Sequence, residues 1–158
     1  YLNLPERTRQ VSRDGWYTTG DVMRRDENGF FYFVRRNDDM IVCGGENVHP
    51  VEVEQMLERH PEIDAACVVP VPDEIKGQKP VAFVVLRAGS DLREDEIKRF
   101  ALANGPAFQH PRRVYFRDRL PLAGTNKTDR KRLEMDAVAL HQADQSDARS
   151  ASMTERRD

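Results

Sequence analysis

The sequence predicts an α+β fold with a small, mostly antiparallel sheet and about three packed helices, preceded by a β-hairpin. The first observation is the order of elements after Met40, which reads strand, helix, strand, strand, helix, strand, helix. The second is Asn28-Gly29, a strong hairpin pattern that precedes the apolar run 30–34. The third is the charged segment 35–39, which separates two apolar runs and is where a domain boundary is expected.

Apolar runs and turn residues predict the first half of the main domain. Ile41-Val42 is expected to form a short buried strand, and Gly44-Gly45 allows the next turn to adopt positive φ. A helix is expected from about Pro50 to Arg59, because proline suits the first helical position. Two strands are expected to follow, at 63–69 and 81–86, the second covered on both faces because it is apolar throughout.

Helix start and stop patterns define the second half. Residues 91–94 have the spacing of a capping box, with Asp91 as the cap, and Asn104-Gly105-Pro106 ends that helix. A short strand is expected at 114–116. A last helix is expected to start at Thr128 or Asp129 and to continue to about Leu140. From His141 onward no apolar period is visible, so this tail is predicted to be disordered.

Composition narrows the classes of function. The formal net charge of -2 argues against a module held on nucleic acid by phosphate contacts. No apolar stretch is long enough to span a bilayer, and no signal peptide is visible. Cys43 and Cys67 lack zinc-site spacing and the histidines are scattered, so we expect no metal site and reduced thiols in a cytoplasmic protein. A chain that opens on Tyr1 is expected to be a fragment.

Three motifs in a fixed order make the chain recognisable. They are YTTGD at Tyr17–Asp21, RNDDMIVCGGENVHPVEVE at Arg36–Glu54, and PLAGTNKTDRK at Pro121–Lys131. They resemble the Tyr-x-Thr-Gly-Asp, hinge-and-turn and terminal lysine motifs of the adenylate-forming superfamily, which includes acyl- and aryl-CoA ligases, peptide-synthetase adenylation domains and beetle luciferases. Residues 44–50 are most similar to the CoA ligases for aryl and medium-chain acids.

The resemblance implies an ATP-dependent ligase that forms AMP and pyrophosphate. A carboxylic acid attacks the α-phosphate of ATP to give an acyl-adenylate, and the thiol of coenzyme A then displaces AMP. In such enzymes the small C-terminal domain rotates between the two steps. The implied boundaries are 1–37 for the end of the large N-terminal AMP-binding domain, 38–140 for the mobile C-terminal domain and 141–158 for the tail. The fragment by itself is expected to be inactive.

Each site residue is carried over from the matching motif position. Lys127 is the implied catalytic residue, because a fixed ammonium stabilises the charge that develops around the α-phosphate. Asp38 is the implied hinge, where the backbone change of the rotation is absorbed. ATP and AMP are expected to bind Asp21, Arg36, Asn47 and Lys127. Coenzyme A is expected to bind Gly44, Gly45, Phe108 and Arg112. Mg²⁺ would be held mainly by the phosphates and the large domain.

The residues alone leave other interpretations open. Lys127 is also consistent with a solvated lysine in a basic loop, and Phe108 with a core or loop anchor. Lys76 stands where some members of the superfamily have a stacking tryptophan. Two alternative functions remain: an adenylation module that loads a carrier protein, and a non-catalytic interaction module. The partners implied by the first interpretation are the N-terminal domain, a carboxylic acid, ATP and coenzyme A, with no nucleic acid.

Overall fold

The computed structural model of this chain describes residues 2–36 and 39–154. The chain divides into two compact units, Tyr1–Met40 and Ile41–Asp158. Each unit is described by itself below.

The first unit contains one short helix and two small antiparallel sheets. Its elements are α1 (Pro5–Val11), β1 (Ser12–Arg13) paired with β2 (Trp16–Tyr17), and β3 (Asp21–Arg25) paired with β4 (Phe31–Arg36). The predicted hairpin is confirmed as β3–β4, with Gly29 in its turn at φ +88°. Phe31 and Phe33, on one face of this hairpin, are more than half exposed, and Tyr32 and Val34 on the other face are exposed as well. Neither of its faces is therefore covered within the unit.

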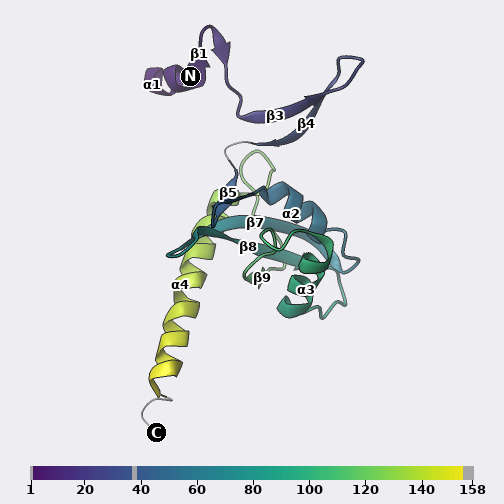
Figure 1. The fold of residues 1–158 in the computed structure, drawn as a ribbon, viewed down its shortest axis with the longest axis vertical. Helices are drawn as coiled ribbons and strands as arrows, with labels where there is room; N and C mark the ends of the chain where they lie inside the picture. Colours follow the sequence, from purple (N-terminus) through teal and green to yellow (C-terminus); the bar gives the residue numbers. More distant parts are fainter. Residues whose placement is uncertain (1, 37–38, 155–158) are drawn as a thin grey trace. The chain divides into compact units, whose positions relative to one another are not determined.

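The second unit is built on a five-stranded sheet (Figure 1). The strand order is β6-β5-β8-β7, and β9 pairs with β8. The strands are β5 (Ile41–Cys43), β6 (Glu46–Val48), β7 (Ile63–Asp73), β8 (Gly77–Leu86) and β9 (Val114–Phe116). Every pair is antiparallel except β8–β9, so the predicted mostly antiparallel sheet is confirmed.

Helices cover both faces of this sheet. They are α2 (Pro50–Leu57), α3 (Glu94–Asn104) and α4 (Arg130–Thr154). Successive strand residues point to opposite faces. Val68 and Val84 therefore pack in one core cluster with residues of α2 and α3, whereas Val69 and Phe83 pack in another with residues of α4. The prediction that the strand beginning at Val81 is covered on both faces is confirmed.

The strand β7 runs further than the sequence predicts. Pro70 and Pro72 were expected to end it, yet pairing with β8 continues to Asp73. The N–H of Val68 points away from β8 and donates to a glutamate side chain. Alternate residues share this orientation, so both prolines place their nitrogens toward the free edge, where no ladder hydrogen bond is lost.

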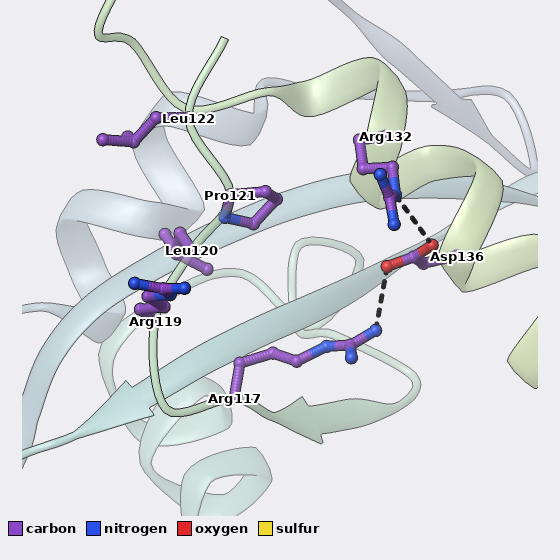
Figure 2. A pocket seen from close by; sticks show the side chains of 7 residues that line it. All are labelled: Arg117, Arg119, Leu120, Pro121, Leu122, Arg132 and Asp136. Carbon is purple, nitrogen blue, oxygen red and sulfur yellow. Dashed lines mark hydrogen bonds and ion pairs between the residues drawn. The ribbon is translucent and has the colours of Figure 1, made fainter.

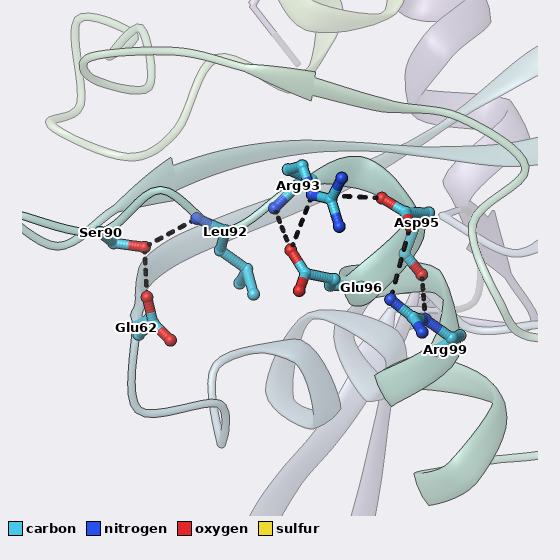
Figure 3. Close-up of polar contacts among 7 residues, drawn as sticks. All are labelled: Glu62, Ser90, Leu92, Arg93, Asp95, Glu96 and Arg99. Carbon is cyan, nitrogen blue, oxygen red and sulfur yellow. Dashed lines mark hydrogen bonds and ion pairs between the residues drawn. The ribbon is translucent and has the colours of Figure 1, made fainter.

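The helix α3 begins later than the predicted cap at Asp91. Arg93 is the N-cap, and its N–H donates to Glu96 Oε2 over 3.0 Å (Figure 3). Ser90 Oγ donates to Glu62 Oε2 over 2.7 Å and accepts the N–H of Leu92. These bonds tie residues 90–92 to the segment before β7, so the capping box forms two residues later than predicted.

The helix α4 continues to Thr154, although the sequence predicts disorder from His141. Hydrogen bonds connect this extension to β9 and to the residue before it. Arg113 Nε donates to Asp144 Oδ2 over 2.9 Å, and the Tyr115 hydroxyl donates to the same oxygen over 3.3 Å. Burial, together with the charge of Asp144, raises the pKa of Tyr115 to about 12. A hydrophobic period alone does not reveal these polar anchors.

No helix in the described part of the chain is both long and apolar enough to cross a membrane.

Candidate functional site

Lys127 lies in a tight loop between β9 and α4. The N–H of Asp129 donates to the Pro121 carbonyl, and the N–H of Ala123 donates to the Lys127 carbonyl, both over 2.8 Å. Leu122 forms an isolated antiparallel bridge with Thr128. The loop is thus closed by its own backbone, and we refer to residues 121–129 as the lysine loop.

The side chain of Lys127 is exposed on the descending arm of this loop, just before the bridge residue Thr128. Within the described part of the chain, its ammonium takes part in no hydrogen bond or ion pair with another residue. The amine is therefore open to solvent. This geometry is compatible with both interpretations of Lys127 that the sequence leaves open.

The start of α4 anchors the lysine loop to the core. Asp129 is the cap, one of the two candidates predicted, and its Oδ1 accepts the N–H of Arg132 over 3.1 Å. Leu133 follows one turn later and is fully buried against the sheet. The loop therefore has a rigid base although its tip is exposed.

A partly buried ion pair next to this loop was not predicted. Arg130 binds both carboxylate oxygens of Glu54, with Nη1–Oε1 2.8 Å and Nη2–Oε2 2.6 Å. Glu54 lies on α2, and its side chain points into the unit and is 8% exposed. The only indication in the sequence is an acidic residue beside the apolar stripe of α2.

The predicted glycine turn joins β5 to β6. Gly44 and Gly45 both have positive φ, +61° and +88°, as a two-residue type I′ hairpin requires. A β-carbon at Gly44 would lie 3.6 Å from the stem of Lys76, whereas one at Gly45 would meet nothing within 4 Å. Asn47 lies two residues further along β6, and its side chain is exposed. Gly45 therefore forms an open tip, flanked by an asparagine and a lysine.

The two other residues expected at coenzyme A lie on the α3–β9 connection. Phe108 is half-buried and packs against the core, which fits its interpretation as an anchor. Arg112 places Nη1 2.7 Å from His110 Nε2. The pKa of His110 is lowered, mainly by burial and further by the positive charges of Arg112, Lys98 and Lys76. Positively charged side chains from three separate segments of the chain therefore lie near the His110 ring.

Asp21 and Arg36, both expected at the nucleotide, contact one another in the first unit. They are partners across the β3–β4 ladder, and Arg36 Nη1 donates to Asp21 Oδ1 over 2.8 Å. Arg36 Nη2 also donates to the Thr19 carbonyl. The remaining predicted residue, Asp38, lies outside the described residues.

Comparison with known proteins identifies the second unit. Residues 52–127 match the family model of the AMP-binding enzyme C-terminal domain. The chain carries an AMP-binding enzyme C-terminal domain.

Relatives of this C-terminal domain include several CoA ligases. The chain is 41% identical over 134 residues to a 2-succinylbenzoate–CoA ligase of Geobacillus kaustophilus, covering 85% of this chain and 27% of the relative. It is 43% identical over 138 residues to a medium/long-chain-fatty-acid–CoA ligase of Mycobacterium tuberculosis, covering 83% of this chain and 24% of the relative. The chain thus spans about a quarter of the length of these relatives.

Solved structures show the same fold. An ATP-bound chimera of RpMatB and BxBclM superposes with a TM-score of 0.83 at 29% identity, over 89% of this chain and 28% of that one. The anthranilate CoA ligase AuaEII in complex with anthranoyl-AMP gives a TM-score of 0.75 at 32% identity, over 90% of this chain and 28% of that one.

The matched family range divides the predicted site residues. Phe108, Arg112 and Lys127 lie inside it, with Lys127 as its last residue. Gly44, Gly45 and Asn47 precede it on the β5–β6 hairpin, within the same compact unit. The C-terminal domain therefore presents its exposed lysine and its glycine turn on one structural body.

A cavity of about 430 Å³ borders the lysine loop of this C-terminal domain (Figure 2). Asp136 accepts a hydrogen bond from Arg117 Nη2 over 3.0 Å and lies 3.6 Å from Arg132 Nε. The residues that line this cavity are Arg117, Arg119, Leu120, Pro121, Leu122, Arg132 and Asp136. Among the described residues, no group of three or more His, Cys, Asp or Glu is placed to hold a metal ion.

Proposed function

We propose that this chain is the C-terminal part of an ATP-dependent acyl- or aryl-CoA ligase. It would adenylate a carboxylic acid and then form the CoA thioester, together with a larger N-terminal domain. The observation that carries this proposal is the exposed Lys127 on a rigid loop of an AMP-binding enzyme C-terminal domain. The names of the relatives support the reaction class.

In the adenylation step, Lys127 would meet the α-phosphate of ATP. A compact ammonium on a flexible stem can enter such a site and stabilise the charge that develops on the phosphate oxygens. Asp21 would accept hydrogen bonds from the ribose hydroxyls, and Arg36 beside it would bind the nucleotide. Asn47 would contact the adenylate. When ATP is bound, Mg²⁺ would be held mainly by its phosphates and the larger domain.

In the thioester step, the glycine turn would border the path of the pantetheine arm. The open space at Gly45 supports this assignment, because a side chain there would stand in the way of a thiol. Arg112 and Lys76 would bind the phosphates of the coenzyme A nucleotide, and Phe108 would contact its base. A carrier protein does not present that nucleotide, so these cations favour coenzyme A as the acceptor.

We further propose that the second unit rotates as one body between the two steps, about the segment that includes Asp38. The division of the chain after Met40 supports a boundary there. The exposed apolar hairpin β3–β4 supports an N-terminal partner domain, because a two-stranded hairpin with both faces uncovered is marginally stable alone. Residues 1–37 would belong to that larger domain.

A chimera tests the proposal. This chain replaces the matching C-terminal part of the Geobacillus kaustophilus ligase, and Lys127→Ala is introduced. We expect ATP–pyrophosphate exchange to fall about 10²–10³-fold, because one preorganised charge contact to the transition state is lost. Thiolysis of a supplied acyl-adenylate should persist, since Lys127 has withdrawn in that step.

Lys131→Ala is the matched control. It removes an exposed lysine four residues away, and both half-reactions should continue at the parental rate. Equal losses of exchange and thiolysis in Lys127→Ala, or an unchanged exchange rate, would exclude Lys127 from the adenylation role.

A further inference from the structure

The ion pair of Glu54 and Arg130 is the most strongly constrained polar contact near the lysine loop. Glu54 is the one charged residue that is buried among those the structure describes. Arg130 meets it with two near-parallel hydrogen bonds of 2.8 and 2.6 Å, an arrangement that fixes the guanidinium in distance and in plane. A single-point contact would leave the arginine free to rotate.

The same pair also closes the free edge of β7. Glu54 Oε1 accepts the N–H of Val68 over 2.6 Å, and Arg130 Nη1 donates to the Val68 carbonyl over 3.1 Å. Glu58, the residue that follows α2, accepts the N–H of Ala66 over 3.1 Å. Arg130 is therefore locked to a helix and to a strand at once, both of which belong to the core.

Arg130 transmits this position to the lysine loop. It lies three residues after Lys127, and the intervening Asp129 closes the loop through its N–H bond to Pro121. At its other end, α2 follows directly from β6, the strand that leaves the glycine turn. One partly buried ion pair therefore fixes the lysine loop to the helix that follows the glycine hairpin.

We infer that Glu54 and Arg130 are positioning residues for Lys127. They act through the backbone of residues 127–130 and determine the position of the Lys127 ammonium in the adenylation step. This inference rests on the proposed function, because it needs Lys127 to act in adenylation. A displacement of about 1 Å at a reacting group can lower a rate about 10²-fold.

The test uses the same chimera with Arg130→Lys, which keeps the charge and loses the double contact with Glu54. We expect kcat for adenylation to fall about 10²-fold while KM for ATP stays within about threefold, because positioning in the transition state is lost and binding is not. Thiolysis of supplied acyl-adenylate should stay near the parental rate. Arg132→Lys is the matched control, because its partner Asp136 is not buried, and it should leave both half-reactions unchanged.

A double variant separates positioning from general stability. If Arg130 acts through Lys127, adding Arg130→Lys to Lys127→Ala should cause no further loss of adenylation. Glu54→Gln provides a second, nearly isosteric variant that should give the same pattern even if Arg130→Lys folds poorly.

An unchanged kcat in both single variants would overturn the inference. So would a further loss in the Lys127→Ala background, or parallel losses in both half-reactions. A failure of the proposed function is recognised separately, because Lys127→Ala would then leave pyrophosphate exchange intact.

Discussion

Replacing Gly45 with leucine tests whether the glycine turn borders the thiol path, and Gly89 provides an unusually close control. The two glycines have nearly the same φ, +88° at Gly45 and +84° at Gly89. A β-carbon built on either meets nothing within 4 Å. Both substitutions therefore place leucine at a positive φ in open space, and they differ in their place on the domain.

The stability effect follows from the backbone conformation. A non-glycine residue in the left-handed region costs about 1–2 kcal/mol. No steric clash adds to that value, because both positions open onto empty space. Gly45→Leu and Gly89→Leu should therefore lower the free energy of unfolding by similar amounts, within about 0.5 kcal/mol of one another. Urea denaturation of the two variants of this chain measures the difference.

The two variants should differ in thiolysis. In the chimera, Gly45→Leu should slow acyl-CoA formation from supplied acyl-adenylate at least tenfold, which corresponds to about 1.4 kcal/mol of lost transition-state stabilisation. Its pyrophosphate exchange should fall much less. Gly89→Leu should leave both half-reactions close to the parental rates.

Two results would refute this reasoning. If Gly89→Leu slowed thiolysis as much as Gly45→Leu, the loss would come from strain in the domain and not from obstruction. If Gly45→Leu slowed exchange more than thiolysis, the turn would not border the path of the thiol.

Two further predictions concern the frame that holds the site. Phe83 is fully buried between β8 and α4, so Phe83→Ala should lower the unfolding free energy by about 3–5 kcal/mol in urea denaturation, and a loss below about 1 kcal/mol would mean that this core is not packed as described. The hydrogen bond from Lys79, with the N–H groups of Lys76 and Ile75, lowers the pKa of Asp73 from 3.8 to about 2. Its stabilising contribution is therefore complete above about pH 4 and is lost as the pH falls through about 2, and Asp73→Asn should flatten the acid limb of the melting temperature in that window. An acid limb identical to that of the parent chain would contradict this role.

Features that depend on local chemistry were predictable from the sequence. Asn28-Gly29 and Gly44-Gly45 both form turns, because few residues other than glycine accept positive φ at low cost. Pro50 starts α2 as expected, because its fixed φ suits the first turn of a helix. In each case the residues that determine the conformation are neighbours along the chain.

Elements that depend on distant partners were missed. The three-residue strand β6 was missed for a different reason: its partner β5 is its neighbour across the glycine turn, but three residues contain too little pattern to reveal a strand. Pro70 and Pro72 stay within β7 because their nitrogens face its free edge, which depends on the register of the pairing. The helix α4 extends because Asp144 bonds to Tyr115 on β9 and to Arg113, the residue before it.

The candidate site divides in the same way. The three motifs, in their order, pointed to Lys127, Gly44 and Gly45, whose roles remain predictions. The residues alone left open whether Lys127 is simply a solvated side chain. The structure shows that the lysine loop is rigid at its base and exposed at its tip. It also brings Asp21 and Arg36 together, a contact that the strand register produces.

The sequence by itself determined the fold class, the glycine turns and the residues on which the chemistry is proposed to depend, because each of these is encoded within a few neighbouring positions. Only the tertiary structure decided how the lysine loop is held. Glu54 and Arg130 are 76 residues apart in the chain, and their pairing exists only once α2, β7 and α4 have packed together. The buried Glu54 carboxylate and the partly buried Arg130 guanidinium can be told from surface charges only after the surrounding strands and helices have excluded most of the water from them.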